Sequence, residues 1–159
     1  MCGIVGLISA DPPQRLARRV AAMNAAIVYR GPDGAGVHLA PRLALAMRRL
    51  AIIDLHSGQQ PMSTPDGVTI VFNGEIYNFQ ALRSELGARG YAFRTRSDTE
   101  VILNLYHAEG VAAFARLHGM FAVAIHDPRS NELILARDQV GIKPLYIAEL
   151  DGELLFASE

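Results

Sequence analysis

The chain has only one cysteine, Cys2, and cannot form an internal disulfide, a composition that suits a reducing compartment. No apolar stretch reaches the length of a transmembrane helix, and the N-terminus lacks the charged and apolar regions of a signal peptide. The net charge of −1 comes without a basic cluster, which disfavours nucleic acids and anionic membranes as partners. We therefore expect a soluble, cytoplasmic protein that binds neither nucleic acid nor membrane.

Motifs for nucleotides and metals are also missing from the sequence. No Gly-x-x-x-x-Gly-Lys-Ser/Thr phosphate loop occurs. The five histidines have no metal-ligand spacing, and with a single cysteine a zinc site is not expected. The sequence therefore predicts no metal and no cofactor for this segment.

What is present has the composition of one folded domain. Its 159 residues are 50% hydrophobic and 19% charged, which is enough apolar surface to bury a core. Apolar runs separated by turn signals predict strands over most of the chain. The predicted strands are Cys2–Ser9, Gly36–Ala40, Leu43–Met47, Leu50–Ile53, Val68–Phe72, Met120–His126, Glu132–Ala136, Leu145–Ala148 and Glu153–Ala157.

Three helices are predicted between the strands, from their apolar periodicity and their end signals. They run from Asp11-Pro12 to about Ile27, from about Phe79 to Leu86, and from Ser97 to about Gly110. Asp11 and Asn78 are the expected caps of the first two, and Ser97 with Glu100 has the spacing of a capping box. Strands at both ends with helices between them predict a layered α+β domain.

Cys2 directly follows the initiator methionine. If Met1 is removed, one residue carries both a thiol and a free α-amino group, which titrate near ~8.5 and ~7.7–8.0 respectively. Such a residue is a nucleophile with its own base, as acyl transfer requires. The alternative is a small buried side chain on a core strand, because free cysteine is often inert packing.

Several further segments decide between these alternatives, because together they form an ordered set. They are Met1–Gly6, Arg30–Asp33, Arg49–Asp54, Gln60-Pro61, Phe72–Asn78, Ser97–Ile102, Gly119–Ala122, Arg137–Tyr146 and Phe156–Glu159. In this order they resemble the glutamine amidotransferase domain of the N-terminal nucleophile hydrolases, in the asparagine synthetase branch. The resemblance spans residues 1–159 and implies a four-layer αββα sandwich, two antiparallel sheets between helices.

The resemblance also implies a mechanism. Cys2 would attack the side-chain amide of glutamine, with its own α-amino group as base, and form a γ-glutamyl thioester that water hydrolyses. Asn73 and Gly74 would supply the oxyanion hole through a side-chain amide and a backbone N–H. Taken alone, the Asn73-Gly74 dipeptide favours a hairpin turn.

The same resemblance assigns residues that would bind glutamine. Arg49 would hold the α-carboxylate, and its alternative is a solvated arginine at a strand end. Asp98 and Glu75 would hold the α-ammonium, although Asp98 also suits the dipole of a helix start. Backbone atoms of the segment that includes Leu50, Ile52 and Ile53 would complete the pocket.

Two positions depart from the family pattern. Tyr29 stands where the family usually has histidine before Arg-Gly-Pro-Asp, and Met47 stands where histidine often precedes the arginine clamp. Neither position is catalytic in the family's mechanism. The departures bear on the subgroup and on the shape of the pocket.

The Ser-Gly-Gly-x-Asp-Ser nucleotide loop of the family's synthetase domain is absent from these residues. We expect this domain to be the N-terminal part of a longer enzyme. ATP and magnesium would be confined to the synthetase domain, which accepts the ammonia. Assembly of the protein as a homodimer is compatible with the sequence. Two alternatives remain. One is the glutaminase domain of a hexosamine-type or purine-type amidotransferase, and the other is a non-catalytic binding or assembly module of the same fold.

Overall fold

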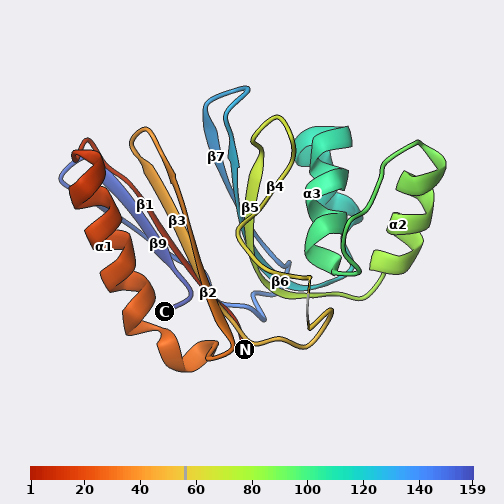
Figure 1. The fold of residues 1–159 in the computed structure, drawn as a ribbon, viewed down its shortest axis with the longest axis horizontal. Coiled ribbons are helices and arrows are strands. Elements are labelled where there is room, and N and C mark those ends of the chain that lie inside the picture. Colours follow the sequence, from red (N-terminus) through yellow and green to blue (C-terminus); the bar gives the residue numbers. More distant parts are fainter. Residues whose placement is uncertain (56) are drawn as a thin grey trace.

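The computed structural model describes residues 1–55 and 57–159. Runs of consecutive strands are separated by one helical segment near the N-terminus and another in the middle of the chain (Figure 1). The strands are β1 (Gly3–Ile8), β2 (Gly34–Ala40), β3 (Leu43–Arg49), β4 (Met62–Ser63), β5 (Thr69–Ile76), β6 (Gly119–Asp127), β7 (Glu132–Arg137), β8 (Tyr146–Leu150) and β9 (Glu153–Ala157). The α-helices are α1 (Pro13–Ala26), α2 (Phe79–Ala88) and α3 (Asp98–Glu109), and the 3₁₀ helices are η1 (Val28–Arg30) and η2 (Gly110–Arg116).

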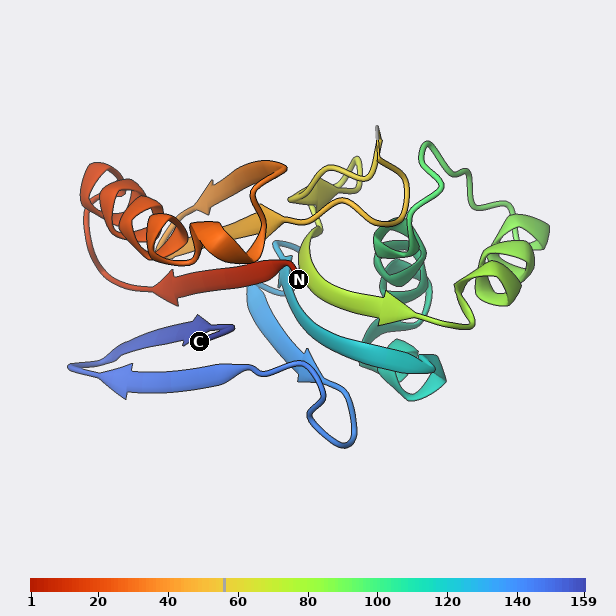
Figure 2. The same cartoon turned by 90° about the horizontal axis from the view of Figure 1, so that it is seen from below.

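The strands form two antiparallel sheets that face each other. One sheet has the order β2-β3-β1-β9-β8 and the other the order β4-β5-β6-β7. Helix α1 covers the outer face of the first sheet, and α3 and α2 lie on the outer side of the second (Figures 1 and 2). This arrangement is the predicted αββα sandwich, with both chain termini at the first sheet.

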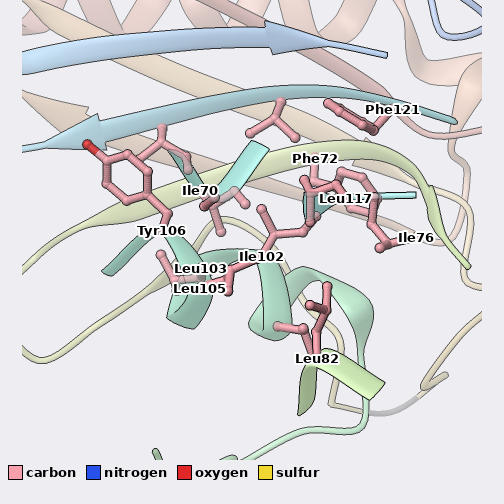
Figure 3. Close-up of a cluster of buried hydrophobic side chains, with 14 of the residues drawn as sticks. Ile70, Phe72, Ile76, Leu82, Ile102, Leu103, Leu105, Tyr106, Leu117 and Phe121 are labelled. Atoms are coloured by element: carbon pink, nitrogen blue, oxygen red, sulfur yellow. The ribbon is translucent and has the colours of Figure 1, made fainter. Parts of the chain in front are cut away.

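Three hydrophobic clusters hold the four layers together. Alternation along β1 sends Ile4 toward the second sheet and Val5 toward α1, because successive side chains of a strand point to opposite faces. The cluster between the sheets also contains Val71 of β5. The largest cluster lies between the second sheet and its helices, and Figure 3 shows Ile70 and Phe72 of β5 pointing into it. Asn73 lies two positions after Val71 on β5, so its side chain points to the same face, between the two sheets.

Most predicted strands are confirmed, but one is wrong. The apolar run Leu50–Ile53 forms no strand, and these residues lie in a loop after β3. The first two backbone N–H groups of this run donate to side chains, to the thiol of Cys2 and the carboxylate of Asp33, instead of to a neighbouring strand. Sequence reading also missed the short strand β4 and the 3₁₀ helix η2.

Of the caps expected for α1 and α2, one is wrong and the other is confirmed in position only. The N-cap of α1 is Pro12 without a side-chain bond, and Asp11 instead pairs with Arg19 at 2.6 Å. Asn78 holds the N-cap position of α2, as expected, but its side chain makes no capping bond. Its Oδ1 accepts the N–H of His118 at 3.0 Å, and its Nδ2 donates to the carbonyl of Arg116 at 2.9 Å.

The start of α3 follows the prediction in part. The hydroxyl of Ser97 accepts the N–H of Glu100 at 3.3 Å, which is one half of a capping box. The carboxylate of Glu100 does not return to Ser97 but accepts the N–H groups of Arg94 and Thr95. Gly110 ends the helix with a φ of 62°, a conformation that suits glycine. In the described part of the chain, no helix has both the length and the apolar character needed to span a membrane.

Candidate active site

A cavity of about 190 Å³ is lined by residues of both sheets and by Met1. Figure 1 shows the N-terminus at one end of the sandwich. Residues of both sheets, of α3 and of the loop after β3 line the cavity. They are Met1, Cys2, Arg49, Leu50, Ile52, Ile53, Gly58, Gln60, Phe72, Asn73, Gly74, Glu75, Ser97, Asp98, Thr99, Met120 and Lys143. All nine residues that the resemblance assigned to catalysis or glutamine binding are among them, although they come from distant parts of the sequence.

Cys2 lies just before β1 and packs, half-buried, against the apolar cluster between the sheets. Its Sγ accepts the backbone N–H of Leu50 at 3.3 Å and lies 3.5 Å from the carbonyl oxygen of the same residue. Its own carbonyl accepts a hydrogen bond from Nε of Arg30 at 3.0 Å. The loop after β3 therefore orients the thiol of Cys2, and the Arg-Gly-Pro-Asp segment orients the backbone of the same residue.

Asn73 and Gly74 do not form a turn. Both lie inside β5, where they pair with Ala122 and Phe121 of β6. A Cβ atom at position 74 would stand 2.2 Å from the carbonyl oxygen of Met120, so only glycine fits this approach of the two strands. The turn propensity of the dipeptide is thus overridden by sheet pairing.

The side-chain amide of Asn73 is buried without a partner. The residue is 1% exposed, and its Nδ2 atom has no hydrogen-bond acceptor among the described residues. An unsatisfied buried donor costs about 1–3 kcal/mol, and most native structures avoid it. This donor lies on the wall of the cavity that also holds Cys2, where a ligand oxygen could accept its hydrogen bond.

Arg49 is not a solvated surface residue. It is 4% exposed, and its guanidinium donates to the carbonyl oxygens of Ile53 at 3.2 Å, of Leu55 at 3.3 Å and of Asp54. The side chain therefore holds the loop after β3 in place while it lines the cavity. No carboxylate of the described residues lies within 4 Å of the guanidinium, whose charge thus remains for an anionic ligand.

The Arg-Gly-Pro-Asp segment supports the same loop from the other side. The N–H of Asp33 donates to the carbonyl of Arg49 at 3.0 Å, and its carboxylate accepts the N–H of Ala51 at 2.9 Å. Pro32 forms an isolated bridge with Arg49. Sequence reasoning used this segment only as a mark of resemblance, and its spacing along the chain gives no signal of this contact.

Asp98 is the first residue of α3 and is 4% exposed. Its carboxylate accepts the N–H of Ile76 at 3.1 Å, and it lines the cavity together with Glu75. Burial raises the pKa of Asp98 to about 6, and the negative charge of Glu75 acts in the same direction. Backbone hydrogen bonds to the carboxylate act against this rise. At neutral pH the helix start therefore presents a carboxylate that gains stability from a cationic ligand.

Sequence reasoning missed several residues of the cavity wall. Gln60 connects three elements, because its side chain accepts the N–H of Phe72 at 2.6 Å and donates to the hydroxyl of Thr99 at 3.2 Å. Met120 and Lys143 also line the cavity. The only signal for Gln60, Thr99, Met120 and Lys143 in the sequence is that all four lie within the motif segments that carry the resemblance.

The two departures from the family pattern lie outside the cavity wall. Tyr29 is 67% exposed in η1, where its hydroxyl interacts with Glu159. Met47 is fully buried in β3 and packs in the cluster between the sheets. Neither is among the described residues that line the cavity.

The sandwich of two antiparallel sheets, with a cysteine at its N-terminal end, defines an N-terminal nucleophile hydrolase fold of the amidotransferase type. The chain belongs to the glutamine amidotransferase domain family, whose family model matches residues 1–159. It is 42% identical to asparagine synthetase [glutamine-hydrolyzing] 2 of Bacillus subtilis and 40% identical to asparagine synthetase B [glutamine-hydrolyzing] of Escherichia coli. Both similarities cover 100% of this chain but only 22% and 29% of those proteins.

One solved structure that resembles this fold belongs to another amidotransferase. The glutamine phosphoribosylpyrophosphate amidotransferase of B. subtilis, complexed with ADP and GMP, superimposes with a TM-score of 0.78. The two sequences are 23% identical, over 99% of this chain and 42% of that one. At this identity the likeness establishes the fold alone. The chain thus spans about a quarter of the length of these two curated relatives.

Proposed function

We propose that this domain hydrolyses the side-chain amide of glutamine through a thioester on Cys2. One observation carries the proposal: the unpaired Nδ2 donor of Asn73, the thiol of Cys2 and the charged groups of Arg49 and Asp98 line one cavity. A nucleophile, an oxyanion donor and a charged clamp for an amino acid are the parts that amide hydrolysis needs.

The chemistry begins after removal of Met1. The free α-amino group of Cys2 takes the thiol proton, and Sγ attacks the carboxamide carbon of glutamine. The tetrahedral oxyanion accepts hydrogen bonds from Nδ2 of Asn73 and the N–H of Gly74. The amine then returns its proton to the leaving nitrogen and ammonia departs, which leaves the γ-glutamyl thioester. Water attacks the thioester and releases glutamate and the thiol.

The other end of glutamine is held by charge. Arg49 takes the α-carboxylate, where a guanidinium can donate two parallel hydrogen bonds. Asp98 and Glu75 take the α-ammonium from the opposite wall. Leu50, Ile52 and Ile53 supply the backbone that encloses the ligand. Because both charged ends of an amino acid are recognised, a simple amide without them would be a poor substrate.

The ammonia would go to an asparagine-synthetase-type domain in the same chain. The support is that this segment makes up only 22% and 29% of two relatives with that name, which match it over its whole length. ATP and magnesium would be needed only by that domain, because the residues of this cavity suit an amino acid. A cytoplasmic location and assembly as a homodimer belong to the same proposal.

A second candidate is the glutaminase domain of a purine-type or hexosamine-type enzyme. The likeness to a phosphoribosylpyrophosphate amidotransferase favours it only at the level of the fold. The higher identity to glutamine-hydrolysing asparagine synthetases ranks it lower. A non-catalytic module is disfavoured because Cys2, Asn73, Arg49 and Asp98 are all present and share one cavity.

The proposal is tested by the intact mass of the protein before and after reaction with diazo-oxo-norleucine, an electrophilic analogue of glutamine. We expect loss of the Met1 mass and one adduct, located on Cys2, whose formation glutamine suppresses. The Cys2→Ala variant serves as the matched control and acquires no adduct. A protein that retains Met1 and stays unlabelled would support the non-catalytic module instead.

A further inference from the structure

Lys143 is a buried cation on the wall of the cavity, and the mechanism above does not use it. It is the only lysine of the chain, it is 4% exposed, and it shares the cavity with Cys2 and Gly74. Among the described residues, no carboxylate lies within 4 Å of its Nζ atom. A buried charge without a counter-ion is costly, so its retention at this place calls for a reason.

The position of Lys143 is fixed by its backbone. The carboxylate of Asp138, itself buried, accepts the N–H groups of Lys143 at 3.0 Å, of Ile142 at 2.8 Å and of Phe121 at 3.1 Å. Phe121 is the partner of Gly74 across the sheet. Asp138 thus attaches the loop after β7 to the strand beside the oxyanion donors, and it uses its oxygens on backbone donors instead of on Nζ.

The ammonium of Lys143 contacts the residue that maturation removes. Its Nζ lies 2.8 Å from Sδ of Met1. Five covalent bonds join that sulfur to the backbone nitrogen of Cys2, so Nζ lies within about 9 Å of the nitrogen that becomes the free amine. Removal of Met1 takes away the thioether and leaves the cation facing the new N-terminus.

The two arginines around Cys2 are already engaged. Arg30 contacts the carbonyl of Cys2 and pairs with Glu159 at 3.1 Å, which compensates its charge. Arg49 is bonded to loop carbonyls. Two carboxylates also line the cavity, Glu75 from β5 and Asp98 from α3. The Asp98 carboxylate is bonded to the N–H of Ile76. Arg49 and Lys143 are the two cationic side chains of the cavity wall in the described part of the chain. Arg49 has carbonyl acceptors, whereas the Nζ atom of Lys143 has neither a carboxylate nor a carbonyl acceptor among the described residues.

We propose that Lys143 is a positioning residue that keeps the mature α-amino group of Cys2 in its neutral form and favours the thiolate. This inference rests on the proposed function. An unperturbed α-amino group titrates near ~7.7–8.0 and is mostly protonated at pH 7, where it cannot act as base. A second cation within about 9 Å opposes that protonation by about one pH unit at an effective dielectric constant of about 20. Lys143 itself exchanges no proton with the substrate.

The test compares Lys143→Met and Lys143→Arg with the wild type, all in the full-length protein. Methionine keeps the buried stem without the charge, and arginine restores the charge. The first readout is the rate of alkylation of Cys2 by iodoacetamide between pH 5.5 and 9.5, measured as adduct mass on that residue. The second is kcat for glutamine hydrolysis at saturating glutamine over the same range.

We expect Lys143→Met to move both profiles to higher pH by about one unit, which is about a tenfold loss of rate at pH 6.5, with recovery at alkaline pH. Lys143→Arg should stay within about 0.3 unit of the wild type. Superimposed profiles, or a loss equal at every pH, would overturn the inference because a merely structural role predicts them. If Lys143→Met does not fold, as judged by thermal unfolding, Lys143→Gln takes its place.

The two readouts separate this inference from the proposed function. Alkylation by iodoacetamide needs no glutamine recognition and no turnover. A wild type that hydrolyses no glutamine would overturn the proposed function, while the alkylation profiles would still decide the role of Lys143. A wild type that hydrolyses glutamine, with unshifted profiles in Lys143→Met, would overturn only the role of Lys143.

Discussion

The carboxylate of Asp33 accepts the backbone N–H of Ala51 at 2.9 Å, across 18 positions of sequence. This bond joins the Arg-Gly-Pro-Asp segment to the loop whose residues Leu50 and Ile53 line the cavity. Residues 50–55 belong to no strand, so the shape of this part of the loop depends on such side-chain contacts and on the hydrogen bonds of Arg49. The shape of the pocket wall therefore depends on a residue that does not line it.

Asp33→Ala should weaken glutamine binding with little effect on the chemical step. Loss of one exposed side-chain bond costs about 0.5–1.5 kcal/mol, which corresponds to a two- to tenfold rise in KM. Steady-state kinetics of glutamine hydrolysis measure it. Asp33→Asn keeps the acceptor oxygen and is the matched control. A lower kcat at unchanged KM would show that the loop acts on the nucleophile instead.

Asn73→Ala should lower kcat by about 10²–10³ while KM changes little, because the oxyanion forms only during reaction. Its Nδ2 atom has no partner among the described residues, so this deletion breaks no hydrogen bond of that atom. The midpoint of thermal unfolding should therefore change little. Asn73→Asp, which keeps the shape and lacks the donor, should be at least as slow. Near-normal turnover in both variants would exclude Asn73 from the oxyanion hole.

Arg49→Ala should raise KM for glutamine by a factor of about 30 or more, because loss of a buried partner of a carboxylate costs about 2–5 kcal/mol. Arg49→Lys should not rescue binding. An ammonium cannot donate to the carbonyls of Ile53 and Leu55 and also bind a carboxylate in the planar geometry of a guanidinium. The Michaelis constants of the two variants test this directly, and a normal constant in Arg49→Lys would reduce the role of Arg49 to charge alone.

The sequence predicted most strands and all three α-helices, because their apolar periodicity reports burial on one or both faces. Prediction from the sequence failed where side-chain contacts outweighed the local sequence pattern. Leu50–Ile53 is as apolar as a strand, but its first N–H groups are taken by Cys2 and Asp33. Asp11 had the identity of a cap but pairs with Arg19 instead.

The site was predicted by resemblance and not by spacing. Arg49, Asn73 and Asp98 lie on three elements that meet only after the two sheets stack, and no local pattern encodes that meeting. Turn propensity alone would have misplaced Asn73, because pairing of β5 with β6 outweighs it. The sequence indicated no role for Lys143, since a lone lysine is usually a solvated surface residue.

Asp98 makes glutamine binding depend on pH in the range near 6. Burial holds its pKa at about 6 in the folded protein, above the ordinary value of 3.8. The α-ammonium of glutamine needs the ionised carboxylate, so KM in the wild type should rise as pH falls through about 6. Asp98→Asn should show a high KM that is flat with pH. Asp66→Asn is the control, because Asp66 lies outside the cavity wall and its pKa is lowered.

The raised pKa of Asp98 also makes the stability of the fold depend on pH. Binding of glutamine weakens as pH falls, whereas the free energy of unfolding decreases as pH rises. A carboxyl group with a higher pKa in the folded state binds its proton more tightly there than in the unfolded chain. Its contribution to the free energy of unfolding is therefore complete below about pH 4 and is lost as pH rises through about 6. A shift of about two units corresponds to about 3 kcal/mol. Urea unfolding of wild type and Asp98→Asn at pH 4 and pH 7 measures it. We expect the wild type to lose stability relative to the variant between these values, and a pH-independent difference would place the carboxylate in solvent.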